Sequence, residues 1–262
     1  MCDLLTIGRF IWQIHILVFY LMRYFLFVLV ILNVNLLSAQ NNLSQKIVKW
    51  RVDKITKFAT PSYWERNERK LFGIPMLHVN KPEFYENVKQ TVDSLRNEGY
   101  VVFYEGIDLE LETKEETDLY MKKFRSVTHE TLMNYYDENN EVNQSFQIDN
   151  YTYQKEADYG LDVTKDVHCD MNIKELVLKY EEKFGVINLT DCDWKTPLGK
   201  KYTCSKKNRK GYDYMISTLR NEHLFQQIEN SKADKIAVIY GKAHIDVLHL
   251  MLKRSGWKYT HL

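Results

Sequence analysis

Several motifs that define common enzyme classes are missing from this sequence of 262 residues. It contains no Gly-x-Ser-x-Gly elbow, no glycine-rich phosphate-binding loop and no His-Glu-x-x-His. These absences argue against an α/β-hydrolase, a P-loop enzyme and a zincin. The chain also has no Cys-x-x-Cys pair among its four cysteines, so a zinc ribbon is not supported.

An excess of charge of one sign is missing as well. The 36 basic and 35 acidic residues give a formal net charge of +1, so the total charge does not indicate nucleic acid or an anionic surface as a partner. The sequence shows no low-complexity tract and no clean domain boundary. With 45% apolar residues, the chain is long enough for one domain with a sizeable core. We predict a single α/β domain over residues 40–262.

The N-terminal part of the chain carries its longest hydrophobic run, residues 10–37, which is long enough to raise the question of a membrane span. Starting at Met22, however, a short basic region, the apolar residues 24–37 and then Ser38-Ala39-Gln40 are typical of a secretory signal peptide. We predict that residues 1–39 are a signal peptide, with an uncleaved signal anchor as the alternative. In both cases the protein is exported, to the periplasm or the extracellular space, and touches a membrane only through an uncleaved N-terminal segment.

Three cysteines follow the predicted signal peptide, which is an odd number. Cys192 and Cys204 could close a small loop in an oxidising compartment and leave Cys169 unpaired. Three unpaired thiols are the alternative. The segment around two of these cysteines, residues 191–210, is rich in lysine and predicts an excursion from the main fold.

The last thirty residues combine a strand, a histidine and a helix. Residues 236–240 form an apolar run without alternation, which predicts a strand buried on both faces. Gly241 is expected to provide a tight turn, and His244 follows the carboxyl end of that strand. Because ligands of open α/β sheets bind outside the carboxyl ends of the strands, His244 is a candidate site residue. His249, on another part of the helix, is expected on the surface, and residues 257–262 predict a final strand.

The same order of features occurs earlier in the chain. Residues 70–79 predict a strand with His78 near its end, and Asn80 is expected as the N-cap of a following helix. Residues 100–104 then predict another buried strand, which ends at Glu105. The chain therefore contains two related strand-His-helix-strand units.

These two units predict an α/β fold with a central mixed, largely parallel sheet that is flanked by helices. Because parallel strands share one carboxyl edge, we expect His78, Glu105 and His244 to lie close together. Two imidazoles and a carboxylate suit either a catalytic divalent ion or an acid/base site. Both interpretations remain open at this point.

Two further charged residues lie in informative positions. Asp170 precedes a predicted helix over residues 173–184, so it is either the N-cap of that helix or a metal ligand or general base. Arg220 shares the apolar stripe of Ile216 and Leu224, which predicts that it is buried, and a buried arginine must be paired. Its guanidinium could form a structural ion pair with a core carboxylate or lie at the pocket floor, and the two interpretations are not exclusive.

The remaining segments give coarser predictions. Residues 45–69 indicate an irregular or helical lead-in from which Trp50 and Trp64 could pack onto the domain. Residues 112–136 and 212–228 have the composition and periodicity of helices. The asparagine-rich residues 137–154 predict a surface loop or hairpin.

Gly241-Lys242-Ala243-His244, together with His78 and the strand-terminal Glu105, resembles the TraB/GumN family. That family includes the Tiki-type metalloproteases and is related to the erythromycin-esterase and ChaN-like proteins. The resemblance covers most of the chain from Leu71 onward, and Arg220 matches the family's arginine on the helix before the last strand.

Two further positions bear on the match. Asp170 fits an aspartate that the family carries in its middle region. The first Gly-x-x-His motif departs from the pattern, because Pro75 stands where glycine is usual. Proline removes a donor and changes the turn, so the geometry around His78 is expected to differ.

The resemblance implies an exported metal-dependent hydrolase with a peptide bond as the favoured target and an ester as an alternative. A divalent ion (manganese, cobalt or zinc) would be held by His78, Glu105, His244 and Asp170. It would polarise the scissile carbonyl and lower the pKa of its bound water. Glu105 would be ligand or general base, both histidines would be catalytic, and Arg220 would stabilise negative charge or hold a substrate carboxylate. The alternative is a non-catalytic protein that binds a small, haem-like ligand in the same pocket.

Overall fold

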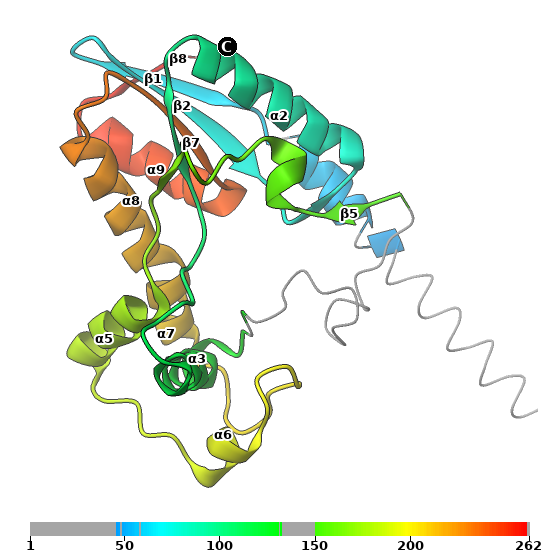
Figure 1. The fold of residues 1–262 in the computed structure, drawn as a ribbon, viewed down its shortest axis with the longest axis vertical. Coiled ribbons are helices and arrows are strands. Elements are labelled where there is room, and N and C mark those ends of the chain that lie inside the picture. The colour runs from blue at the N-terminus through cyan, green and yellow to red at the C-terminus, as the bar shows by residue number, and fades with distance from the viewer. Residues whose placement is uncertain (1–45, 48, 58, 131, 133–149, 261–262) are drawn as a thin grey trace, which may run out of the picture. The chain divides into compact units, whose positions relative to one another are not determined.

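The computed structural model describes residues 46–47, 49–57, 59–130, 132 and 150–260 (Figure 1). The predicted signal peptide or anchor, residues 1–39, and most of the predicted loop over residues 137–154 lie outside this part of the chain. Within it, no helix is long and apolar enough to cross a membrane. The chain divides into two compact units, Met1–Arg51 and Val52–Leu262, and the second contains every element that follows.

The strands are β1 (Ser62–Arg66), β2 (Arg69–Met76), β3 (Val79–Asn80), β4 (Val101–Tyr104), β5 (Thr152–Tyr153), β6 (Val167–His168), β7 (Lys235–Gly241) and β8 (Lys258–Thr260). The helices are α2 (Pro82–Asn97), α3 (Lys114–Thr128), the 3₁₀ turn η1 (Glu156–Tyr159), α5 (Ile173–Phe184), α6 (Asp191–Lys195), α7 (Arg209–Asp213), the π-helical turn η2 (Tyr214–Thr218), α8 (Leu219–Asn230) and α9 (Lys242–Arg254).

The main sheet has six strands in the order β6-β4-β7-β2-β1-β8. Strand β7 lies at its centre and runs parallel to both β2 and β4, and β6 is parallel to β4. Strand β1 is antiparallel to its two neighbours, β2 and β8. Both predicted units are present, as β2–α2–β4 and β7–α9–β8. The prediction of an α/β fold with a mixed, largely parallel sheet and flanking helices is confirmed.

The prediction of an irregular or helical lead-in over residues 45–69 is wrong in its last part, which forms β1 and begins β2. The two strands are joined by Asn67 and Glu68, both with positive φ (48° and 68°), the conformation of a tight hairpin turn. Trp64 of β1 is fully buried and its indole N–H donates to Nδ1 of His249 at 3.3 Å. His249 itself is half-buried, so the prediction that it lies on the surface is wrong.

Each face of the sheet carries its own core. Side chains alternate along β7, so that Ile236 and Val238 pack with residues of α8 and α9, whereas Ala237 and Ile239 pack with residues of α2. Figure 1 shows α2 and α9 on opposite sides of these strands. Burial on both faces explains why β7 is apolar throughout.

A third core joins the helices α3, α5 and η2 through residues such as Phe124, Leu176 and Met215. The helix predicted over residues 173–184 is confirmed with those bounds, and the helix predicted over residues 112–136 is confirmed as the shorter α3. Helix α3 ends at His129, which takes a left-handed conformation with φ 61°.

The helix predicted over residues 212–228 is interrupted by the π turn η2. The extra residue in this turn shifts the buried face, so that Met215 is fully buried and Ile216 is half-buried. The buried residue thus lies five rather than four positions before Arg220. This shift brings both Arg220 and Asn221 to the buried side of α8.

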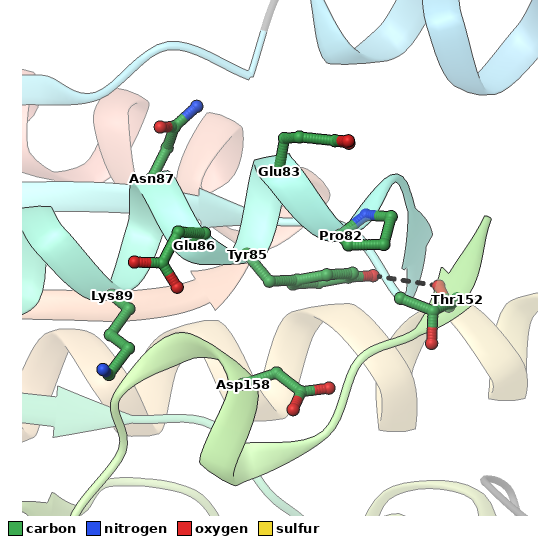
Figure 2. Close-up of a pocket in the computed structure, with 8 residues that line it drawn as sticks. All are labelled: Pro82, Glu83, Tyr85, Glu86, Asn87, Lys89, Thr152 and Asp158. Carbon is green, nitrogen blue, oxygen red and sulfur yellow. Dashed lines mark hydrogen bonds between the residues drawn. The ribbon is translucent and has the colours of Figure 1, made fainter. Parts of the chain in front are cut away.

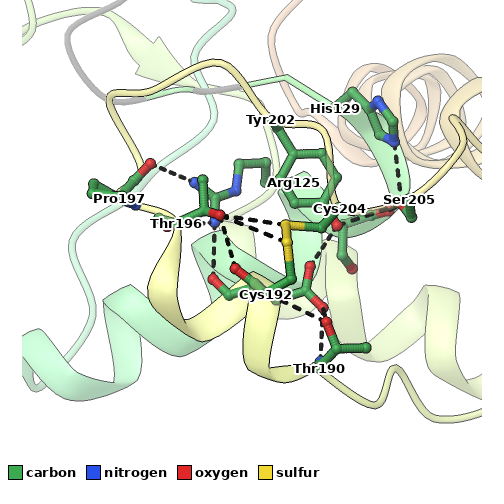
Figure 3. The surroundings of a disulfide bond; sticks show 11 residues. Arg125, His129, Thr190, Cys192, Thr196, Pro197, Tyr202, Cys204 and Ser205 are labelled. Carbon is green, nitrogen blue, oxygen red and sulfur yellow. Dashed lines mark hydrogen bonds between the residues drawn. A yellow bond between two sulfur atoms is a disulfide. The ribbon is translucent and has the colours of Figure 1, made fainter.

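The two alternatives for the cysteines are decided by a disulfide between Cys192 and Cys204, whose Cα atoms are 5.7 Å apart. Cys169 is unpaired and buried. The predicted excursion over residues 191–210 begins with the short helix α6 and reaches the start of α7. The disulfide ties Cys192 in α6 to Cys204 and so closes the first part of this segment, as Figure 3 shows.

Candidate functional site

Four charged or polar side chains meet at the carboxyl edge of the parallel strands, and we call them the strand-end cluster: Glu105, Asp170, Arg220 and His244. Glu105 directly follows β4, Asp170 follows β6, and His244 lies in the first turn of α9 after β7. Arg220 lies in the first turn of α8. The sequence prediction that Glu105 and His244 meet is confirmed, with His244 Nε2 3.4 Å from Glu105 Oε1.

The carboxylate of Glu105 is held in its ionised form. Its Oε1 accepts a hydrogen bond from Nη2 of Arg220 at 2.5 Å, and its Oε2 accepts one from the backbone N–H of Gly241. Burial raises the pKa of Glu105, but Arg220, His244 and the Gly241 N–H outweigh it and lower the pKa to about 2. Glu105 is therefore a fixed negative charge at neutral pH.

Gly241 has a different role from the tight turn that we expected. Its φ of −49° and ψ of 138° are accessible to any residue, so its conformational freedom is not required. A Cβ atom at this position would instead lie 3.1 Å from Glu105 Oε2. Glycine lets the carboxylate of Glu105 approach the backbone between β7 and α9.

Arg220 lies at the centre of the cluster and connects its other three members. Its Nε donates to both carboxylate oxygens of Asp170 at 3.0 and 3.1 Å, and Nη2 donates to Asp170 and Glu105. Its Nη1 donates to Nε2 of His244 at 3.2 Å. Burial lowers the pKa of the guanidinium, yet Glu105 and Asp170 raise it above its ordinary value. The prediction of a buried, paired Arg220 is confirmed.

Asp170 is not the N-cap of α5, so that alternative is wrong. The N-cap is Asn172, whose side chain accepts from the N–H of Glu175 while Glu175 reciprocates, a complete capping box. The Asp170 side chain is fully buried and accepts from the backbone N–H groups of Gly106 (3.1 Å) and Met171 (2.8 Å) as well as from Arg220. In this arrangement Asp170 orients Arg220.

A neutral imidazole completes the cluster. Nδ1 of His244 lies 3.1 Å from Oδ1 of Asn221, and the amide of Asn221 is fixed because its Nδ2 donates to the carbonyl of Ser217 at 2.7 Å. Nδ1 is therefore the protonated nitrogen, and the lone pair of Nε2 accepts the hydrogen bond from Nη1 of Arg220. Burial lowers the pKa of His244 more than Glu105 raises it, and Arg220 lowers it further.

Asn221 is the site residue that sequence reasoning missed. An asparagine beside a buried arginine is not distinctive, and helical periodicity places two adjacent residues on different parts of the helix surface. The π turn η2, which precedes them, changes the phase of the buried face, and Leu219, Arg220 and Asn221 are all buried after it. The sequence contains no clear signal for that turn.

His78 is not a member of the hydrogen-bonded cluster. Its side chain is exposed in the segment between β2 and β3, and its carbonyl accepts from the N–H of Gln154 at 2.9 Å. Its charge nevertheless lowers the pKa of both Glu105 and His244, so it is within electrostatic range of them. Pro75 is the buried penultimate residue of β2 and lies beyond the last residue pair that β2 forms with β1, where a missing N–H is tolerated.

The four predicted metal ligands do not fit an ion in this arrangement. Within the part of the chain that the structure describes, no group of three or more His, Cys, Asp or Glu side chains is placed to hold a metal. The reason is that the cation between Glu105, Asp170 and His244 is the guanidinium of Arg220, which occupies the oxygen and nitrogen lone pairs that an ion would need. The metal therefore stays a prediction.

A cavity of about 710 Å³ lies against the first half of α2. As Figure 2 shows, it is lined by Pro82, Glu83, Tyr85, Glu86, Asn87 and Lys89 of α2, by Thr152 of β5 and by Asp158 of η1. The hydroxyl of Tyr85, one of the lining residues, donates to the carbonyl of Leu77 at 2.8 Å. This bond fixes the backbone directly before His78. The four cluster residues do not line it.

The geometry of this site has to be interpreted by itself, because comparison of the chain with family models, with curated proteins and with solved structures finds no match.

Proposed function

We propose that this chain is an exported hydrolase that cleaves an acyl bond at the strand-end cluster, with a peptide as the favoured substrate. The observation that carries the proposal is the ionised Glu105 beside a neutral His244 whose Nε2 lone pair is only 3.4 Å from the carboxylate. A base beside a fixed negative charge is what proton abstraction from water requires. The pair also lies outside the carboxyl ends of parallel strands, where α/β folds bind ligands.

Each residue of the cluster has a role in this proposal. Nε2 of His244 accepts from Nη1 of Arg220 at 3.2 Å, so this N–H has to move aside before Nε2 accepts a proton from water. Glu105 stabilises the imidazolium that forms, and the imidazolium returns the proton to the leaving amine or alkoxide. Arg220 uses four of its five N–H bonds for Glu105, Asp170 and His244. Among the described residues the fifth, on Nη1, has no partner, and it can donate to the oxygen that becomes negative in the transition state. His78 supplies a second imidazole, which lies within electrostatic range of Glu105 and His244.

Export is supported by the disulfide between Cys192 and Cys204, because such bonds persist in oxidising compartments such as the periplasm or the extracellular space. The apolar N-terminal run fits the same proposal. Membership of the TraB/GumN family also stays a proposal, supported by the positions of Glu105, Arg220 and His244 in one cluster.

The proposal is tested by incubating the purified protein with a peptide library and with simple acyl esters. We expect hydrolysis by the unmodified protein and at least a hundredfold loss of kcat in Glu105→Gln and His244→Ala, on the order of a lost general base. His223→Ala, which removes a half-buried imidazole of α8 outside the cluster, is the matched control. Equal activity in His244→Ala and His223→Ala would refute the role of the cluster.

The predicted divalent ion is tested by the same assay after dialysis against a chelator, together with elemental analysis. Loss of hydrolysis, and its recovery with manganese, cobalt or zinc, would establish the metal-dependent reaction and require Arg220 to move. Full activity without metal would establish the acid/base reaction. If neither metal nor hydrolysis is found, the alternative of a non-catalytic binding protein for a small, haem-like ligand takes its place.

A further inference from the structure

A dense group of cations lies on the disulfide-closed loop and the helix that follows it. Residues 195–210 contain seven basic side chains and no acidic one, although the whole chain has a net charge of only +1. They are Lys195, Lys200, Lys201, Lys206, Lys207, Arg209 and Lys210, and every one is exposed. We call these seven side chains the basic loop. None of the seven belongs to the strand-end cluster.

Two members of the basic loop form ion pairs with described residues at its edge. Lys195 pairs with Asp191 at 3.3 Å and Lys207 with Glu130 at 3.4 Å. Both pairs are solvent-exposed and long, so they are weak. The nearby carboxylate of Asp193 is buried and bonded to Thr190 and Tyr202, and it does not reach the surface cations.

The backbone beneath the basic loop is fixed. Besides the disulfide, the fully buried Arg125 of α3 donates to three carbonyls of the loop, those of Asp193 (3.1 Å), Thr196 (2.9 Å) and Pro197 (2.7 Å). Figure 3 shows this guanidinium beside the disulfide and the ring of Tyr202. The cations are thus displayed on a rigid platform, which reduces the ordering cost of binding a partner.

An exposed aromatic side chain lies next to the cations. Trp194 in α6 is 50% exposed and directly precedes Lys195. A large apolar side chain that is left half in water beside a set of lysines is typical of a surface that meets the interface of a lipid bilayer, where the indole partitions into the headgroup region.

We infer that the basic loop and Trp194 form a docking surface for an anionic lipid membrane. Seven clustered cations fall in the range that attracts anionic headgroups, and each cation near the surface adds to the attraction. A soluble polyanion would use the lysines alone. The ring of Trp194 contacts Nζ of Lys122 at 5.2 Å yet stays 50% exposed, and this apolar surface beside the cations suits a bilayer interface. This membrane contact is separate from the N-terminal segment and does not depend on the proposed hydrolysis.

The inference is tested by co-sedimentation of the protein with vesicles of phosphatidylcholine, with and without about one third phosphatidylglycerol. Residues 40–262 are used, because the compact unit with all three cores begins at Val52 and the apolar N-terminus would bind any bilayer. We expect binding to the anionic vesicles only, weakened strongly when the salt concentration rises from 0.05 to 0.5 M, roughly the range over which screening becomes complete.

Matched variants separate a specific surface from a general effect of charge. Lys201→Glu, Lys206→Glu and Lys210→Glu together are expected to weaken binding more than about tenfold. The control carries the same charge change at the exposed Lys179, Lys253 and Lys258 and should retain most of the binding.

Trp194→Ala distinguishes lipid from other anions, and it should weaken vesicle binding several-fold while leaving retention by soluble polyphosphate unchanged. Equal loss in the two triple variants would overturn the inference. So would vesicle binding that Trp194→Ala leaves intact, or an absence of binding to anionic vesicles.

Discussion

At the scale of single residues, the cluster depends on one arginine that satisfies three partners. The sequence indicated that Arg220 is buried and paired, because it shares an apolar stripe, but it could not identify Asp170 and Glu105 as the partners. The structural and functional interpretations of Arg220 are compatible, since four N–H bonds are used inside the cluster and the proposed function needs only the fifth. The buried charge is also why the stability of the fold should depend on pH.

Glu105 gives the first prediction. Its pKa falls from an ordinary value of 4.5 to about 2 in the fold, and each pKa unit corresponds to about 1.4 kcal/mol. Because the folded pKa is the lower one, this carboxylate stabilises the fold above pH 4.5 by about 3 kcal/mol. We expect the stabilisation to be lost as the pH falls from 4.5 towards 2, as measured by urea unfolding at a series of pH values.

The variant Glu105→Gln should be less stable at pH 7 and should lose stability less steeply between pH 4.5 and 2. Glu222→Gln, at an exposed position of α8, provides the control and should follow the unmodified protein. A Glu105→Gln variant with the same pH dependence as the unmodified protein would show that Glu105 is not the titrating group.

At the scale of helices and strands, the sequence predicted best where periodicity was strong. Helix α5 and strand β7 have buried faces that a pattern of apolar residues reveals directly. Strand β1 was missed because its sequence, Ser62–Arg66, is mostly polar and contributes the buried Trp64 as its main core residue. Its turn at Asn67 and Glu68 also lacks the glycine that usually marks such a hairpin.

The junction of β7 and α9 gives the second prediction. Gly241→Ala places a Cβ atom 3.1 Å from Glu105 Oε2 and 3.6 Å from the ring of His244, so the carboxylate has to move. We expect a loss of stability of about 1–2 kcal/mol and, if the proposed hydrolysis is found, a larger fall in kcat than in substrate affinity. Thermal unfolding and steady-state kinetics are the measurements.

Gly199→Ala is the matched control for this substitution. Gly199 lies in the disulfide-closed loop, and an added Cβ atom there meets no other atom within 4 Å. It should change neither stability nor activity. If the two alanine variants behave alike, close approach of Glu105 is not the reason for glycine at position 241.

At the scale of the whole molecule, the cluster lies where the cores meet. Glu105 follows β4 and His244 follows the neighbouring β7. Asp170 leads into α5 and Arg220 follows η2, and both α5 and η2 belong to the third, helical core. The sequence predicted the part that depends on strand ends, because parallel strands bring their carboxyl ends together by topology alone. It could not predict that the helical core places the guanidinium of Arg220 between those strand ends, because this placement depends on the π turn η2.

Arg220 therefore links the sheet to the helical core, and its removal should affect both. Arg220→Met leaves the carboxylates of Glu105 and Asp170 buried without their cation, which we expect to destabilise the fold by about 3–5 kcal/mol. Hydrogen exchange should increase most at the start of α5 and α9, next to the cluster, and least in the centre of β2, whose pairing with β7 does not involve Arg220.

The exposed Arg254→Met at the end of α9 is the control for the loss of a guanidinium, and it should leave exchange unchanged. Uniform acceleration over the whole chain in Arg220→Met would mean that the protein unfolds as one unit and that Arg220 is not a local link. Stability equal to that of Arg254→Met would contradict its central role. Localised acceleration, by contrast, would show that the same bonds that position Glu105 and His244 also hold the helical core against the sheet.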